Sequence, residues 1–367
     1  MAKRPQENIL KNIETLDEIA EPLLRWFHSE KRALPWREEP TPYRVWVSEI
    51  MLQQTRVEAV KPYFERFVAA LPDVRALARA DENTLMKLWE GLGYYSRARH
   101  LQSAARLICS DHGGEIPAHF DDLLALPGIG RYTAGAVASI AFGERRPAVD
   151  GNVLRVIMRL LACPADILKE STKRAVEEAL ITRLPEDAGN FNQALMELGA
   201  LICLPRGAAR CPSCPLERLC LAKEANLQAE LPQKTPPKRR RTEKLTIFLL
   251  AKNDKIALEK RPAQGLLAGL WGFPAMEGHL KKKEAEEALQ AIGLIPAKLH
   301  ALPAAQHIFS HITWQMVGWR VELAEPLSEC VASVPTSAPA SSESTTPNAQ
   351  PKRLLLQEAA SPYDIQK

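Results

Sequence analysis

The stretch that decides the fold reads LPGIGRYTAGA and runs from Leu126 to Ala136. A short apolar helix precedes it, Pro127 and Gly128 end that helix, and a new helix begins at Arg131. Gly128 and Gly130 allow the backbone positive φ angles and a close approach to a ligand. The free N–H groups at the start of the new helix attract phosphate. We therefore predict a helix-hairpin-helix in which Gly128, Gly130 and Arg131 hold a DNA strand by its backbone; the alternative is an ordinary glycine-capped helix end.

The composition is that of a globular protein with more than one domain. The chain has 367 residues and a net charge of +4, which permits nucleic-acid binding without by itself indicating it. It contains no apolar run of the roughly 20 residues that span a bilayer, and its N-terminal segment lacks an apolar signal region. We therefore expect a cytoplasmic protein, associated with the nucleoid in a bacterium, that meets no membrane. Its 7 cysteines then favour metal or redox chemistry over disulfides.

Upstream of the hairpin, a helix is predicted over residues 43–53, with Thr41 as its N-cap and Pro42 in its first turn. The apolar residues of this helix that would pack in a core are Val45, Trp46, Ile50 and Met51. Glu49 stands among them. Because a carboxylate in apolar surroundings is costly unless it is paired or functional, Glu49 is a candidate catalytic residue. The alternative is a glutamate on the polar side of the helix.

Two further segments suit contact with DNA. The predicted helix ends in Gln53, Gln54 and Thr55, and planar amides there could wedge into a base stack or bind base edges. Residues 91–99, GLGYYSRAR, interleave aromatic and cationic side chains beside a flexible turn, which suits stacking on bases and pairing with phosphates. From this segment we expect Leu92 and Tyr94 to contact DNA. The alternative is that the tyrosines are core residues and the arginines are solvated.

A cysteine-rich loop follows the helical segments. Cys203, Cys211, Cys214 and Cys220 are separated by seven, two and five residues. Four thiols this close together without a disulfide setting indicate a metal site. The choice lies between a [4Fe–4S] cluster and a structural zinc ion. Zinc ribbons use two distant CxxC pairs, whereas this loop has one pair and two single cysteines, which favours the cluster.

The second half of the chain changes character. The first 220 residues show almost no strand-like alternation, and residues 1–230 are predicted to form a helical region. Residues 231–244, LPQKTPPKRRRTEK, form a basic, proline-rich linker that should be extended and poorly packed. Strands over 245–250, 255–259 and 311–323, with a helix over 284–292, make 245–325 an α+β domain. Residues 326–367 are rich in Ser, Thr and Pro, and we expect them to be disordered.

Together these segments resemble the adenine DNA glycosylases of the MutY family. The resembling segments are 34–37, 42–43, 45–55, 91–99, 126–136, 149–153 and the cysteine-rich loop, and 265–274 and 309–311 resemble the family's C-terminal domain, a relative of the Nudix fold. The resemblance implies a six-helix subdomain at about 33–140 and a cluster subdomain formed by 1–32 and 141–230, with a cleft between them. It also implies a monomeric base-excision repair enzyme that removes adenine opposite 8-oxoguanine or guanine in double-stranded DNA.

The resemblance assigns roles that elementary chemistry supports. A base inside a duplex must be flipped out before it is excised, and Gln54 and Tyr94 stand at the family's intercalating positions. Adenine leaves badly as an anion, so a general acid with a raised pKa must protonate a ring nitrogen, a role that fits Glu49. Asp150 would stabilise the positive charge on the sugar electrostatically or by transient covalent attack, as in retaining glycosidases. Tyr132 would assist at the sugar.

The remaining assignments follow from the same resemblance. Further contacts with DNA are expected from Arg37, Gln53 and Thr55, contacts with the oxidised guanine from Phe309, Ser310 and His311, and ligation of a [4Fe–4S] cluster from the four loop cysteines. Tyr132 occupies the hairpin position where bifunctional relatives such as endonuclease III carry a lysine. A phenol cannot form an imine with the sugar, so we expect little or no lyase activity.

Two features depart from the family pattern. The family's usual cysteine spacing begins with six residues, whereas seven separate Cys203 from Cys211. Gly278 and Glu284 have Nudix-like spacing, but the acidic remainder of a Nudix box is absent, so this domain should recognise a base rather than hydrolyse a nucleotide. Two alternatives stay open: a bifunctional endonuclease III-like enzyme acting on oxidised pyrimidines, and a non-catalytic iron–sulfur DNA-binding protein.

Overall fold

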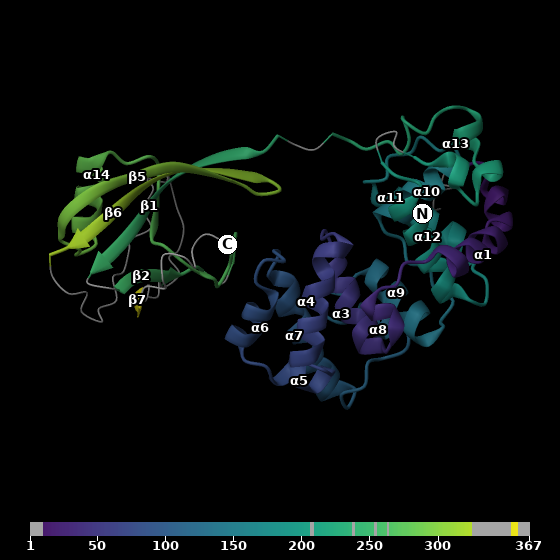
Figure 1. Ribbon diagram of the computed structural model, residues 1–367, viewed down its shortest axis with the longest axis horizontal. Coiled ribbons are helices and arrows are strands. Elements are labelled where there is room, and N and C mark those ends of the chain that lie inside the picture. Colours follow the sequence, from purple (N-terminus) through teal and green to yellow (C-terminus); the bar gives the residue numbers. More distant parts are fainter. Residues whose placement is uncertain are drawn as a thin grey trace, which may run out of the picture. The chain divides into compact units, whose positions relative to one another are not determined.

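The computed structural model describes residues 10–205, 209–236, 239–252, 255–262, 264–324 and 354–358. The chain divides into two compact units, Met1–Pro236 and Pro237–Lys367. The first unit is helical, and the second combines a sheet with helix α14 (Figure 1). The predicted fold class, a helical region followed by an α+β domain, is confirmed. Within the described residues, no helix is both long enough and apolar enough to cross a membrane.

The helical unit contains two buried cores. One core is built from α2–α9, which we call the hairpin body, and the other from η1, α1 and α10–α13 with the cysteine-rich loop, which we call the cysteine body (Figure 1). The element bounds are η1 Ile13–Glu18, α1 Ala20–Glu30, α2 Pro35–Glu38, α3 Pro42–Leu52, α4 Val57–Ala70, α5 Val74–Arg79, α6 Glu82–Trp89, α7 Ser96–Asp111, α8 Phe120–Leu124, α9 Arg131–Phe142, α10 Gly151–Leu160, α11 Glu170–Ile181, α12 Ala188–Leu201, η2 Cys211–Ser213, η3 Glu217–Leu219 and α13 Leu221–Glu224.

The hairpin forms between α8 and α9, with α9 beginning at Arg131 as predicted. Gly128 has φ +76°, and a Cβ atom there would lie 2.5 Å from the Cβ atom of His100, so a side chain is excluded. Gly130 has φ −93° and caps α9 in an extended conformation. The expectation of a positive φ at both glycines is therefore wrong at Gly130, because an N-cap residue has β-region angles. Ile129 is buried in the core of the hairpin body.

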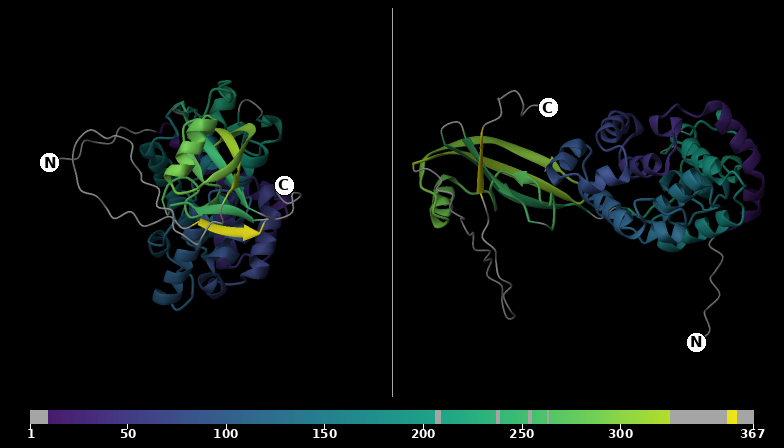
Figure 2. Two further views of the ribbon diagram at one scale, coloured as in Figure 1. Left: turned by 90° about the vertical axis from the view of Figure 1, so that its left-hand side faces the viewer. Right: turned by 90° about the horizontal axis from the view of Figure 1, so that it is seen from below.

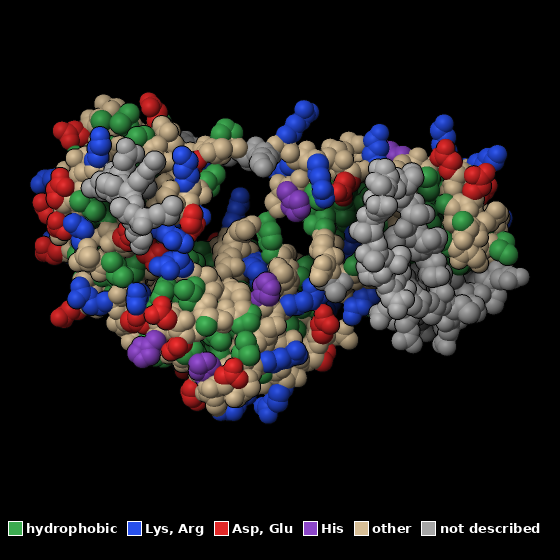
Figure 3. Space-filling model, turned by 180° about the vertical axis from the view of Figure 1, so that it is seen from behind, with side chains coloured by type: hydrophobic (Ala, Val, Ile, Leu, Met, Phe, Trp, Pro, Cys, Tyr) green, Lys and Arg blue, Asp and Glu red, His purple; other side chains and the backbone are tan. Residues whose placement is uncertain are grey.

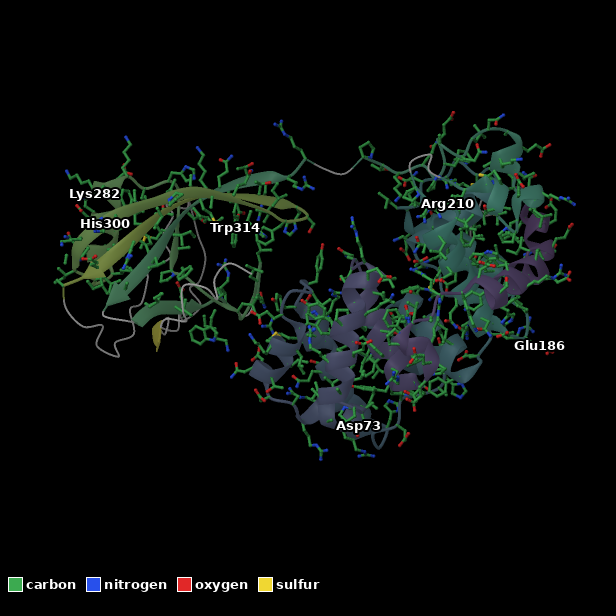
Figure 4. The ribbon with its side chains drawn as sticks, viewed as in Figure 1. Asp73, Glu186, Arg210, Lys282, His300 and Trp314 are labelled. Atoms are coloured by element: carbon green, nitrogen blue, oxygen red, sulfur yellow. The ribbon has the colours of Figure 1, made fainter. Side chains whose placement is uncertain are left out.

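The second unit is built on a mixed sheet. Its elements are β1 Arg241–Lys252, β2 Lys255–Lys260, β3 Trp271–Gly272, β4 Ala275–Glu277, α14 Lys282–Ala291, β5 Pro296–Ile308, β6 Ile312–Leu323 and β7 Leu354–Glu358. The strand order is β3-β2-β1-β6-β5, with β4 beside β1 and β7 beside β2. Helix α14 packs on one face of the sheet, where Ala285 and Leu289 join Phe248 and Val321 in a core (Figure 2). In the long β5–β6 hairpin, Trp314 lies toward the free end and His300 toward the base (Figure 4).

The predicted linker over residues 231–244 is wrong at both ends. Arg159 Nε donates to the carbonyl of Leu231 at 2.9 Å, and the N–H of Ile167 donates to the carbonyl of Gln233 at 3.2 Å, so the start of this segment packs on the helical unit. Residues 241–244 already belong to β1. Hydrogen bonds to the backbone, which composition does not reveal, order both ends.

The predicted disorder of residues 326–367 is wrong for Leu354–Glu358. These residues form β7, which pairs antiparallel with β2 and sets Leu356 opposite Ala257. The apolar run 354–356 has the pattern of a short strand, and the edge of β2 offers it backbone partners. The rest of this tail lies outside the described residues.

Candidate active site

A cavity of about 1070 Å³ lies in the helical unit and is lined by residues of both bodies. The residues predicted from the sequence that line it are Arg37, Glu49, Gln53, Gln54, Thr55, Arg131, Tyr132 and Asp150. They come from three segments that are far apart in the chain: the α2–α3 region, the hairpin and the start of α10. The structure thus brings the three predicted catalytic residues to one cavity.

Glu49 lies in α3 and is only 6% exposed. Its neighbours Trp46, Ile50 and Met51 are buried with it, so the alternative of a solvent-facing glutamate is wrong. Burial raises the pKa of Glu49 to about 7; the hydrogen bond from Tyr132 opposes this rise, and the negative charge of Asp150 adds to it. Near neutral pH this carboxyl group therefore exists partly in the protonated form that a general acid needs.

Tyr132 stands in the first turn of α9 and donates its hydroxyl hydrogen to Oε2 of Glu49. The sulfur of Met196, on α12, lies 3.3 Å from the same hydroxyl oxygen. Burial raises the pKa of Tyr132 well above its usual value, and the charges of Glu49 and Asp150 raise it further. The phenol therefore stays neutral and acts as a hydrogen-bond donor.

Asp150 is the N-cap of α10. Its Oδ1 accepts from the backbone N–H groups of Asn152 at 2.8 Å and Val153 at 2.7 Å, and its Oδ2 accepts from the Asn152 side chain at 2.8 Å. Burial raises the pKa of Asp150, while these hydrogen bonds lower it. The donors and the positive end of α10 favour the ionised form. A buried Glu49 that is partly protonated near neutral pH and an Asp150 that accepts three hydrogen bonds thus share one cavity.

Asn152 is held in turn by Arg155, which lies on the same helix. Its Oδ1 accepts from Arg155 Nη2 at 2.7 Å, and Arg155 Nε donates to the backbone carbonyl of Cys203, also at 2.7 Å. Arg155 is buried on α10. Asp150 is therefore connected through two side chains to the first cysteine of the cysteine-rich loop.

The sequence analysis did not predict one group of polar residues that lines the cavity, Glu197 with its partners Arg32 and Arg37. Glu197, on α12, is 2% exposed and accepts from Arg32 Nε and Nη2, both at 2.8 Å, and from Arg37 Nη2 at 3.1 Å. Arg37 also donates to Gln193 at 2.9 Å. Burial alone would raise the pKa of Glu197, but Arg32 and Arg37 outweigh it and hold the pKa at about 2. A carboxylate inside an apolar helix, the signal that singled out Glu49, could have found Glu197 as well.

The residues predicted to enter DNA lie in two tight loops. Gln54 and Tyr94 both have left-handed backbones, with φ +58° and +49°, and the Tyr94 side chain is 47% exposed. Gln53 donates to Thr133 Oγ1 at 3.3 Å. Leu92 is 7% exposed and belongs to the core of the hairpin body, so its predicted contact with DNA is wrong in this conformation. Its place in the core follows from the tight turn around it, which directs its side chain inward.

Arg131, predicted as a phosphate contact, forms a bidentate ion pair. Its Nε and Nη2 lie 2.8 and 2.6 Å from the carboxylate oxygens of Glu177 on α11. The side chain of Arg131 is 49% exposed, and that of Glu177 is 14% exposed. On the face shown in Figure 3, basic and acidic side chains are interspersed over the helical unit. A phosphate group that binds Arg131 must therefore compete with Glu177.

The cysteine-rich loop packs against α10. Arg159 Nη1 lies 3.2 Å from Cys203 Sγ, and Cys220 Sγ lies 3.6 Å from the Arg159 carbonyl oxygen. Burial raises the pKa of Cys214 to about 12, and the neighbouring thiols of Cys203, Cys220 and Cys211 raise it further. The charges of the four thiols therefore act on one another. In the part of the chain that the structure describes, no three His, Cys, Asp or Glu side chains are placed to hold one metal ion. Residues 206–208, inside the lengthened spacing, lie outside the described part.

Phe309, Ser310 and His311 lie in the second unit, at the turn between β5 and β6. The Phe309 ring meets His307 and Trp314 edge-on, with ring centroids 4.4 and 4.9 Å apart. The Arg261 guanidinium lies over the Trp314 ring. The hairpin turn thus carries a cluster of aromatic side chains in contact with one another, and the contact of Phe309, Ser310 and His311 with the oxidised guanine stays a prediction.

The family of this chain follows from comparison with known proteins. Residues 47–182 match the HhH-GPD superfamily base excision DNA repair protein family, and residues 246–351 match the NUDIX domain, past the domain end predicted at 325. The chain is 35% identical to the adenine DNA glycosylase of Homo sapiens, with 89% of this chain and 73% of that protein covered, and 34% identical to that of Schizosaccharomyces pombe, with 81% and 80% covered. A solved thermostable thymine-DNA glycosylase is 29% identical, with a TM-score of 0.51 over 58% of this chain and 98% of that one. This chain therefore belongs to the adenine DNA glycosylase family.

Proposed function

We propose that this protein excises adenine mispaired with 8-oxoguanine or guanine in double-stranded DNA, by hydrolysis of the N-glycosidic bond. The observation that carries the proposal is the placing of Glu49 and Asp150 in one cavity, with a pKa near 7 for Glu49 and an N-capped carboxylate for Asp150. The adenine DNA glycosylase relatives supply the substrate class.

The residues divide the chemistry between them. Glu49 transfers its proton to a ring nitrogen of the flipped adenine, so that the base leaves as a neutral molecule. The Asp150 carboxylate faces the positive charge that develops on the sugar and stabilises it by its field or by transient attack at the anomeric carbon. Water then completes the hydrolysis. Arg37, which donates to Glu197, and Gln193, which accepts from Arg37, also line the cavity that the base would enter.

We further propose that the enzyme has little or no lyase activity. Strand cleavage in bifunctional glycosylases needs an amine that forms an imine with the opened sugar. Tyr132 stands where that amine would be, and its neutral phenol donates to Glu49 instead. The described hairpin from Leu126 to Ala136 contains no lysine.

The test compares two duplexes, one with adenine opposite 8-oxoguanine and one with a normal A·T pair. Each is incubated with the protein and then analysed with and without hot alkali, which cleaves abasic sites. Cleavage of the mispaired strand only after alkali is the expected result. Strand breaks without alkali would contradict the proposal that the enzyme lacks lyase activity. If the protein binds DNA but releases no adenine from either duplex, the non-catalytic alternative is favoured.

We propose that Cys203, Cys211, Cys214 and Cys220 hold a [4Fe–4S] cluster. The four thiols act on one another's charge, as neighbouring ligands of one group would, and a [4Fe–4S] cluster would take these four thiolates as its ligands. When bound, the cluster would crosslink residues 203–220 through these four thiolates and would supply a redox-active centre. Iron and sulfide analysis with visible absorbance tests this: Cys214→Ser should lose the absorbance and Cys109→Ser should keep it, and bound zinc without iron would refute it.

A further inference from the structure

Arg97, the second residue of α7, gathers three segments of the hairpin body around one guanidinium. It is buried, at 8% exposure. Nη1 donates to the backbone carbonyls of Ile50 at 2.8 Å, Met51 at 2.9 Å and Gln53 at 2.6 Å. Nη2 donates to the carbonyls of Leu92 at 3.2 Å and Gly93 at 3.1 Å and to Thr55 Oγ1 at 3.3 Å. The end of α3 and the loops 53–55 and 91–94 therefore share a single anchor.

All of these acceptors are neutral oxygens. The positive charge of the Arg97 guanidinium is therefore balanced by the dipoles of carbonyl and hydroxyl groups and not by a carboxylate. Ile50 and Met51 lie in the last turn of α3, where the helix dipole presents its negative end. The guanidinium also lies over the rings of Trp89 and Tyr94, at 5.4 and 5.6 Å from their centroids. Burial lowers the pKa of Arg97 to about 10, which still leaves it charged at neutral pH.

Both anchored loops contain strained backbone. Gln54 and Tyr94 are non-glycine residues in the left-handed region, a conformation that L side chains rarely adopt. Conformations of this kind persist only where the surroundings hold them. Arg97 binds the carbonyl groups immediately before Gln54 and before Tyr94, at Gln53 and Gly93.

We propose that Arg97 is a positioning residue that couples the loops 53–55 and 91–94, so that Gln54 and Tyr94 enter the base stack together as one rigid unit. This inference rests on the proposed function and adds a residue that touches neither the base nor the sugar. Lysine cannot replace Arg97, because an ammonium group lacks the planar fork that reaches both loops. Loss of the anchor should therefore impair opening of the duplex more than binding to its backbone.

The experiment uses the full chain and two duplexes with adenine opposite 8-oxoguanine. Both duplexes carry the fluorescent base 2-aminopurine beside the target adenine. The fluorescence of 2-aminopurine rises when the base stack around it opens. In the second duplex a neighbouring mismatch loosens the stack, which lowers the cost of flipping. Single-turnover adenine release, the fluorescence rise and duplex affinity are measured for Arg97→Lys, Arg97→Met and the control Arg106→Met. Arg106 lies on the same helix, exposed, and its guanidinium donates to the carbonyl of Ala78.

For Arg97→Lys on the stacked duplex we expect release and the fluorescence rise to fall together by about tenfold or more. The defect should be several-fold smaller on the loosened duplex, and affinity should change little. Arg97→Met should behave likewise if its melting curve shows a folded protein, and Arg106→Met should match the wild type. Equal defects on both duplexes, or an unchanged fluorescence rise, would overturn the proposal. If the wild type releases no adenine, the proposed function fails, while the fluorescence rise still tests the coupling.

Discussion

Tyr132 donates its hydroxyl hydrogen to Glu49 across the cavity, joining the first turn of α9 to the middle of α3. Both side chains are buried, and burial raises the pKa of each above its usual value. The phenol fixes one carboxyl oxygen of Glu49, and we infer that the other oxygen carries the proton destined for adenine. The hairpin that we predict to hold the DNA backbone thus also holds the proposed acid in place.

Glu49→Gln keeps the shape of the side chain and removes its transferable proton. We expect single-turnover adenine release to fall by about a hundredfold or more, since a neutral amide cannot protonate the leaving base. Affinity for the duplex should change little in a gel-shift measurement. The control is Glu58→Gln, an exposed glutamate on α4 paired with Lys61. Release at the wild-type rate would show that Glu49 is not the acid.

The pH dependence of release should report the raised pKa of Glu49. The active form has Glu49 protonated, so the rate should fall as the pH rises above about 7. The high-pH limb should disappear in Glu49→Gln, whose residual rate has no such acid. In Tyr132→Phe the limb should move to higher pH, because the Tyr132 hydrogen bond lowers the pKa of Glu49. If Glu49→Gln still shows the fall in rate above pH 7, that fall reports the titration of a group other than Glu49.

The same shift predicts a trend in stability. Between the usual glutamate pKa of 4.5 and about 7, the native state keeps a proton that the unfolded chain has released. The free energy of unfolding should therefore fall as the pH rises through this window, by an amount of the order of 3 kcal/mol. Urea unfolding at a series of pH values measures it, with Glu49→Gln as the variant that should lack this component.

Tyr132→Lys should introduce lyase chemistry. The new amine would lie where the sugar is expected, and an amine next to the opened sugar forms an imine that borohydride reduces to a stable bond. Covalent trapping on the 8-oxoguanine duplex and strand breaks without alkali are the expected results. Tyr132→Phe provides the matched comparison and should give neither. If the lysine variant folds, binds DNA and is not trapped, residue 132 does not face the sugar.

Local signals made part of this site predictable. Thr41 and Pro42 marked the start of α3, and the structure confirms that start, with Thr41 accepting from the N–H of Arg44 at 3.3 Å. Glu49 stood out because its neighbours along one helix are apolar. The Arg32–Glu197 pair was missed because its partners are 165 residues apart and only tertiary packing brings them together.

The wrong predictions also arise from tertiary contacts that the local sequence does not reveal. Composition marked residues 231–244 as a linker, yet the carbonyl of Leu231 binds Arg159, which precedes it by 72 residues. The aromatic and cationic neighbours of Leu92 predict a DNA contact, whereas the turn buries this side chain. Residue type predicts what a segment can bind; which way each side chain faces depends on partners elsewhere in the chain.

Asn192 offers a last test of how Asp150 is held. It lies on α12, fully buried, and its Oδ1 accepts from the N–H of Ala148 at 3.1 Å. Its Nδ2 donates to Ser139 Oγ at 2.9 Å and to the Arg146 carbonyl at 2.8 Å. One amide thus ties α12 to α9 and to the segment that ends at Asp150.

Asn192→Asp keeps the acceptor for Ala148 but replaces both donated hydrogen bonds with a carboxylate facing two oxygen atoms. We expect the melting temperature to drop by several degrees and adenine release to slow by about tenfold, with duplex affinity less affected. The control is Asn83→Asp, which makes the same charge change at an exposed position of α6. Equal losses in the two variants would assign the effect to charge alone. A folded Asn192→Asp with wild-type release would mean that the N-cap of α10 holds Asp150 without help from α12.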